Sequence, residues 1–152
     1  MLARTHLSIT LFFVLIMLSI VEYKLVFVLT AFISTFIPDV DSKFSTLGKR
    51  KSFRILQFFV QHRGIFHSFI FLILVTLFFV LFFPVLALGF FLGYSLHLLA
   101  DSFTLQGVRF FYPFGKKSSG LIKTGGRIET LIFVFFSVIN LAIIFQRISL
   151  LF

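Results

Sequence analysis

Long apolar runs dominate this chain and constrain what it can fold into. They fill residues 7–21, 25–37, 65–100 and 128–145. A bilayer core about 30 Å thick needs roughly 20 helical residues, with a lower limit near 17. Only 12% of the residues are charged and 59% are hydrophobic, whereas about a quarter of a soluble domain is charged. The sequence therefore predicts an all-α integral membrane protein and excludes a soluble globular domain.

The apolar runs predict about five transmembrane helices. Run 65–100 would extend about 54 Å as one helix, which is too long for one crossing, so we expect it to break at Pro84 into spans 65–83 and 85–100. Runs 7–21 and 25–37 are short, and they become adequate if the bilayer thins locally. No linker or repeat divides the chain, so residues 1–152 form one membrane-embedded domain.

The first apolar run follows a basic residue, as in a signal peptide. No small-residue cleavage site follows Val21, and apolar sequence resumes at Leu25. We therefore expect the run to be retained as the first span.

Two polar connections separate the predicted spans. Residues 43–63 are basic, and residues 53–60 within them mix apolar and polar positions, which predicts an amphipathic helix in the membrane interface. Residues 101–127 form a long loop rich in glycine and serine, with an aromatic patch at 110–114. The basic run 49–51 is typical of attraction to anionic lipid headgroups.

The placement of lysine and arginine predicts the orientation of the chain. With five spans, twelve of the 14 basic residues fall on one side, and Lys24 and Arg147 fall on the other. Basic residues collect on the cytoplasmic side, so we expect the N-terminus inside. The net charge of +9 then reflects topology and contact with membrane lipids, and no nucleic-acid partner is expected.

The same topology brings all four histidines and four of the five acids to the cytoplasmic face. His97 and Asp101 are four residues apart, so they share one face of a helix. Only Glu22 falls on the outer side. The residues that converge on the inner side are His6, Asp39, Asp41, His62, His67, His97, Asp101 and Glu129.

This set of side chains is typical of a metal centre. The chain has no cysteine, and imidazole with carboxylate suits zinc, manganese or iron. The predicted ligands exceed what one zinc needs, which favours two or more ions, with zinc preferred and manganese as an alternative. The predicted metal ligands are His6, Asp39, Asp41, His62, His67, His97 and Asp101.

A centre of two or more ions favours hydrolysis, and a phosphoester substrate fits best. Asp41 is predicted to be either a bridging ligand or the general base. Glu129 and Arg63 are further candidates for catalysis, with Arg63 and Lys123 able to contact a phosphate.

Four segments together resemble a known family. They are PDVDS (38–42), HRGIFHS (62–68), GYSLHLLADSFT (93–104) and GVRFFYPFG (107–115). They are similar to the YdjM-type membrane-bound, metal-dependent hydrolases of the inner membrane. More distantly, the pattern is similar to zinc-dependent phospholipase C and P1-type nucleases.

That resemblance implies specific counterparts in a zinc cluster. They are His6, Asp39, His62 or His67, and His97 with Asp101. The distant relatives also carry a later His-x-x-x-Glu pair. This chain has no histidine after His97, and Glu129 stands alone, so it departs from the three-zinc pattern.

The sequence thus predicts a metal-dependent hydrolase of a small-molecule, lipid or lipid-linked phosphoester, with its site at the cytoplasmic face of the cell membrane. One alternative is a transporter of a divalent metal, which requires polar groups deeper in the bilayer. Another is a non-catalytic membrane protein. A metal-free acid phosphatase would need an arginine shortly before His97 and a Pro-Ser-Gly-His motif, and both are absent.

Overall fold

The structure, a computed structural model, describes residues 1–41 and 64–150. Within these ranges the chain forms helices and loops and no strand. The interfacial helix expected at 53–60 lies outside the described residues. The elements are α1 (Ala3–Met17), α2 (Lys24–Phe36), η1 (Pro38–Asp41), η3 (Ile65–His67), α4 (Phe69–Phe82), α5 (Pro84–Ser102) and α6 (Arg127–Ser149), where η denotes a 3₁₀ turn.

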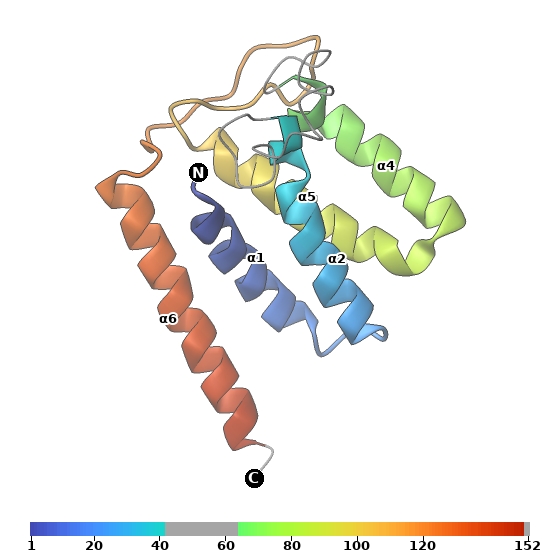
Figure 1. Cartoon of the computed structure of the whole chain (residues 1–152), viewed down its shortest axis with the longest axis vertical. Coiled ribbons are helices and arrows are strands. Elements are labelled where there is room, and N and C mark those ends of the chain that lie inside the picture. The colour runs from blue at the N-terminus through green and yellow to red at the C-terminus, as the bar shows by residue number, and fades with distance from the viewer. Residues whose placement is uncertain (42–63, 151–152) are drawn as a thin grey trace.

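The helices form a bundle with α5 at its centre. α5 packs against α2 and α4, α1 packs against α2, and α6 packs mainly against α1. The N-terminus, η1, η3, the end of α5 and the start of α6 gather at one end of the bundle, at the top of Figure 1. We call this the site end. The α1–α2 and α4–α5 connections lie at the opposite end.

Local sequence signals set the helix boundaries. α2 ends at Phe36 and Pro38 follows shortly after, because a proline has no N–H with which to continue the helical hydrogen bonds. The Ser68 hydroxyl caps α4 by accepting a hydrogen bond from the Phe71 N–H at 3.2 Å. Pro84 occupies the start of α5, after Phe83 leaves helical geometry with φ −143°. The expected break at Pro84 is therefore confirmed.

Two glycines let α5 lie directly on α2. A Cβ atom at Gly93 would stand 2.0 Å from the carbonyl oxygen of Ala31, and one at Gly89 would stand 2.8 Å from that of Phe27. The Ser34 hydroxyl donates to the Gly89 carbonyl at 3.3 Å across the same contact. Small residues four apart are the usual means by which helices approach closely inside a membrane.

In the described part of the chain two helices, α5 and α6, are long and apolar enough to cross a membrane, by length and composition. α5 is mostly buried in the bundle, whereas α6 is largely exposed. α1, α2 and α4 have 15, 13 and 14 residues, which is below the length of about 17 that a crossing requires. The five predicted spans therefore stay a prediction.

The predicted long loop between α5 and α6 folds back across the site end. Val108 and Ser118 exchange backbone hydrogen bonds at 2.8 Å. The loop is joined to the start of α4, where the Phe69 N–H donates to the Phe110 carbonyl at 2.8 Å and the two rings stack. The loop begins later than expected, because α5 continues to Ser102 and holds Asp101 in its last turn.

Candidate metal centre

One stripe of α5 carries both the packing glycines and two candidate ligands. Gly89, Gly93, His97 and Asp101 follow each other at intervals of four, so they share one face of the helix. α2 covers this face at the two glycines. α2 then ends, and η1 takes its place beside α5. The same face of α5 therefore packs against α2 at the two glycines and carries His97 and Asp101 at the site end.

Five candidate ligands from four elements meet at the site end. They come from α1, η1, η3 and α5. His97 lies at the centre, with its Nε2 atom 3.9 Å from Asp39 Oδ1 and 3.9 Å from Asp101 Oδ2. His6 Nε2 is 3.3 Å from Asp101 Oδ1, and His67 Nε2 is 4.0 Å from Asp39 Oδ1. The structure thus brings together His6, Asp39, His67, His97 and Asp101, which the sequence analysis had predicted as ligands.

The three imidazole rings pack against one another away from solvent. His6 stacks on His97 with ring centroids 4.0 Å apart, and His67 meets His97 edge-on at 5.6 Å. All three histidines and Asp101 are buried, whereas the Asp39 side chain is 23% exposed. Asp39 therefore marks the open edge of the centre.

The donors fit a divalent metal ion. Neither ring nitrogen of His97 has a hydrogen-bond partner among the described residues, although buried polar atoms are nearly always paired. Zinc binds nitrogen and oxygen ligands at about 2.0–2.2 Å, so ligand atoms around one ion lie roughly 3–4 Å apart. The distances between the atoms of the centre fall in that range.

The ligand atoms form two overlapping groups. His6, His97 and Asp101 make the first, and Asp39, His67 and His97 make the second, with the atoms of each group within 4.8 Å of one another. His97 belongs to both. Its Nε2 atom has one lone pair and can bind one ion at a time. The arrangement fits either one ion shared by both groups or two ions, of which one takes His97.

The family of the chain is shown by a match that does not depend on the geometry of the centre. The model of the YdjM inner membrane protein family matches residues 1–151. The chain belongs to this family. The family description places the protein in the inner membrane, in accord with the two helices able to cross it. Curated proteins and solved structures gave no match.

The electrostatics of this YdjM-family centre favour a cation at its open edge. Burial raises the pKa of the Asp39 carboxyl above its usual value, and the positive potential of His6 and His67 offsets this only in part. Burial thus penalises the ionised form of Asp39, and a cation bound beside it would offset that penalty. The Met1 amine also contacts the Asp101 carboxylate.

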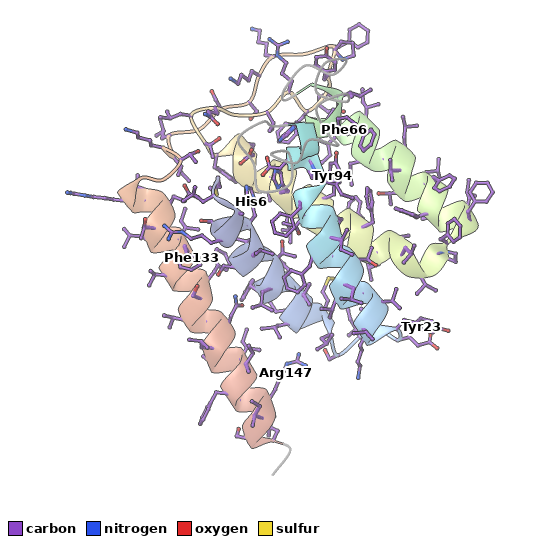
Figure 2. The ribbon with its side chains drawn as sticks, in the orientation of Figure 1. His6, Tyr23, Phe66, Tyr94, Phe133 and Arg147 are labelled. Atoms are coloured by element: carbon purple, nitrogen blue, oxygen red, sulfur yellow. The ribbon has the colours of Figure 1, made fainter. Side chains whose placement is uncertain are left out.

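Tyr94 positions one ligand of the centre, and the sequence analysis missed it. Its hydroxyl donates to the carbonyl of Phe66, which lies in η3 beside His67. Figure 2 shows the two residues close together near the site end. Tyr94 is fully buried in a cluster with Leu72 and Leu98. A buried tyrosine hydroxyl needs a hydrogen-bond partner. The tyrosine at position 94 within apolar run 65–100 was therefore the sequence signal for such a contact.

Glu129 lies at the site end but belongs to neither ligand group. Its Oε1 atom accepts hydrogen bonds from the Leu2 N–H at 2.5 Å and the Thr5 hydroxyl at 2.9 Å. Its Oε2 atom accepts one from the Gly125 N–H at 2.6 Å. These contacts join α6 to the first turn of α1, next to His6. These hydrogen bonds account for the burial of the Glu129 carboxylate without a catalytic role. The predicted role of Glu129 in catalysis stays untested.

We expect Glu129→Ala to lower the free energy of unfolding by about 2–3 kcal/mol, because it leaves three donors without their acceptor. Thermal unfolding in detergent measures the effect. Thr5→Val removes one of the three donors and should cost less, about 1 kcal/mol. If Glu129→Ala unfolds at the wild-type temperature yet loses turnover, the residue is catalytic and this structural assignment is wrong.

Of the remaining predicted site residues, only Lys123 has a side chain that the structure describes. His62 and Arg63 lie outside the described residues. Asp41 ends η1, and its side chain is not described. Lys123 is exposed on the loop between α5 and α6. Their predicted roles in metal binding, catalysis or phosphate contact stay predictions.

Proposed function

We propose that this protein is a membrane-bound, metal-dependent hydrolase of a phosphoester in a lipid or lipid-linked substrate. One observation carries the proposal: three histidines and two aspartates, distant in sequence, converge in a buried centre at one end of the helix bundle. Zinc is the preferred metal, manganese is the alternative, and two or more ions are expected. Predicted basic loops and the predicted topology favour a site facing the cytoplasm.

The location of the ligands supports an enzyme over a transporter. A transporter needs polar groups along a path through the membrane. Beyond the centre, the described core next to α5 holds apolar side chains such as Phe27, Leu72 and Phe90. Its buried hydroxyls, those of Thr10, Ser34 and Thr35, are hydrogen-bonded to one another or to helix backbone. The opposite end of the bundle holds Glu22 and Lys24 but no histidine among the described residues. Entry and exit at one end suit a reaction at the membrane surface.

The chain's own residues suggest how the site would work. His6, His67, His97 and Asp101 would hold the metal from the buried side, with Asp39 at the open edge. When bound, the metal supplies a Lewis acid that polarises a phosphoryl oxygen and makes water acidic enough to attack near neutral pH. Asp41, two residues beyond Asp39 in η1, is the proposed general base, and Arg63 and Lys123 are proposed phosphate contacts.

The test is metal-dependent turnover by purified protein in detergent and in liposomes. Protein stripped by a chelator and reloaded with zinc or manganese is offered short-chain phospholipids and chromogenic phosphoesters. We expect turnover only after reloading. Asp101→Asn should lower turnover about 100-fold or more, because even changes behind the ligands cost about 10–100-fold.

Leu99→Ala is the matched control, since Leu99 is exposed on α5, two residues from His97. Turnover that persists in strong chelator contradicts the proposal. Metal-dependent ion flux in liposomes without hydrolysis supports the transporter alternative instead.

A further inference from the structure

A second candidate site lies on the other side of α1 from the metal centre. α1 carries His6 toward α5, and Arg4, two residues earlier, is about 200° around the helix. Arg4 instead faces α6, with its guanidinium 5.1 Å above the ring of Phe133. Figure 2 shows Phe133 near the start of α6 and His6 on the opposite side of α1. This region shares no residue with the proposed ligand groups.

Polar contacts hold α6 against α1, and a groove lies beside this interface. Glu129 joins the helices near the site end, the Asn140 amide donates to the Ser8 carbonyl at 2.9 Å, and Arg147 donates to the Leu15 carbonyl at 2.6 Å. Such contacts are typical of helix association within membranes. Beside them lies an open cavity of about 470 Å³, bounded by α1, α6 and Phe32 of α2.

The groove has the shape and lining of a site for one acyl chain. Its deeper walls are mostly apolar and include Leu11, Leu141 and Ile144, with Ser137 and Asn140 as the polar residues among them. Along α6 the lining runs from Phe133 to Ile144, about 16 Å at 1.5 Å per residue. The hydrocarbon core is about 30 Å thick. The groove is therefore about as deep as one leaflet, and its volume falls within the range of ligand sites.

The positive charge of Arg4, at the end of the groove nearest the site end, favours the binding of an anion. Arg4 is exposed, and no acidic side chain among the described residues pairs with it. It also lies in the first turn of α1, where the helix dipole already favours negative charge. A phosphate that lies in the headgroup layer would meet both the guanidinium and this potential, while its acyl chain enters the groove.

We propose that the groove between α1 and α6 binds an anionic phospholipid, with one acyl chain along Leu11 and Ile144 and the phosphate at Arg4. This lipid lies on the far side of α1 from the metal centre and is not the substrate there. The lipid fills the cavity beside α6, which is otherwise largely exposed. It also holds α6 against α1, the helix that carries His6. The site is independent of whether the protein is a hydrolase.

The chain has no tryptophan, so a single introduced indole can report on the groove. Ile144→Trp places it in the groove, and Phe145→Trp places it one residue away at nearly the same depth, where Phe145 is 76% exposed. Each variant is reconstituted in vesicles of zwitterionic lipid containing brominated phosphatidylglycerol or brominated phosphatidylcholine with identical chains. Quenching of the indole fluorescence then measures which lipid lies beside it.

At Ile144→Trp we expect phosphatidylglycerol to be preferred about fivefold, the effect of one arginine on an anionic lipid. The preference should disappear when Arg4→Gln is added, and Phe145→Trp should show none. Equal preference at both positions, or a preference that survives Arg4→Gln, means that only ordinary surrounding lipid is present and overturns the proposal. An indole at 144 that neither lipid quenches also overturns it, because another protein segment then fills the groove.

Discussion

His97→Ala is expected to abolish metal retention by the purified protein. His97 is the member common to both ligand groups, and its Nε2 atom lies between the carboxylates of Asp39 and Asp101. Its removal leaves two ligands in each group, too few to hold an ion in either group alone, and it takes the central ligand from a single ion shared by both groups. We expect the apparent affinity to fall about 100-fold or more. Metal content after dialysis, measured by plasma mass spectrometry, and competition with a chromophoric chelator give the result.

The other histidines make the experiment more informative. His6 and His67 each belong to one group only. If the centre holds two ions, His6→Ala and His67→Ala should each lose about one of them, whereas a single shared ion would be retained more weakly in both variants. Leu99→Ala controls for changes to α5 that do not touch the centre. Wild-type protein that binds no zinc or manganese, even after reloading, refutes the metal centre itself.

Sequence reasoning could find the ligands because topology restricts where they lie. The spacing of His97 and Asp101 indicates a shared helical face, and the predicted alternation of spans assigns Asp39, His67 and His6 to the same end of the bundle. The structure places these five side chains together. Apolar runs and Pro84 likewise predicted the order of the described helices, because hydrophobicity and proline act locally. The bounds differ by up to four residues, since α1 covers Ala3–Met17 where the apolar run covers 7–21.

What the sequence could not reveal depends on contacts between distant segments. Glu129 was grouped with the site from its topology alone, but its partners are Leu2, Thr5 and Gly125, which no periodic pattern connects to it. Tyr94 was read as part of an apolar run, although its hydroxyl supports the turn that carries His67. Helix lengths were also uncertain, because turns and fraying decide them as much as hydrophobicity does.

The glycines of α5 were present in the sequence, but their function depends on what faces them. Gly89 and Gly93 are separated by four residues, a spacing typical of close helix contact. Which helix they contact could not be derived from the spacing. The structure shows the backbone of α2 against both, one and two turns before His97. Helix packing and ligand placement therefore depend on the same face of α5.

Gly93→Ala should consequently destabilise the protein and disturb the metal centre together. The added methyl group would stand 2.0 Å from the Ala31 carbonyl oxygen and 2.3 Å from the Ser34 hydroxyl, so α2 and α5 must separate. Overpacking of this kind costs about 3 kcal/mol, which corresponds to a fall of roughly 6–12 °C in Tm for a chain of this size. Thermal unfolding in detergent measures the fall, and chelator competition measures the accompanying loss of zinc affinity.

Substitutions at two other glycines distinguish steric crowding between helices from backbone strain. At Gly89 the new Cβ would meet the Phe27 carbonyl at 2.8 Å, so Gly89→Ala should cost less, about 1 kcal/mol. Gly125 has φ +75° and nothing within 4 Å of a Cβ, so Gly125→Ala should cost about 1–2 kcal/mol from backbone strain alone and leave zinc affinity unchanged. Equal losses in all three variants would mean that α5 does not rest on α2 through Gly93. A graded loss, with zinc affinity falling most for Gly93→Ala, would establish that the α2–α5 contact positions His97.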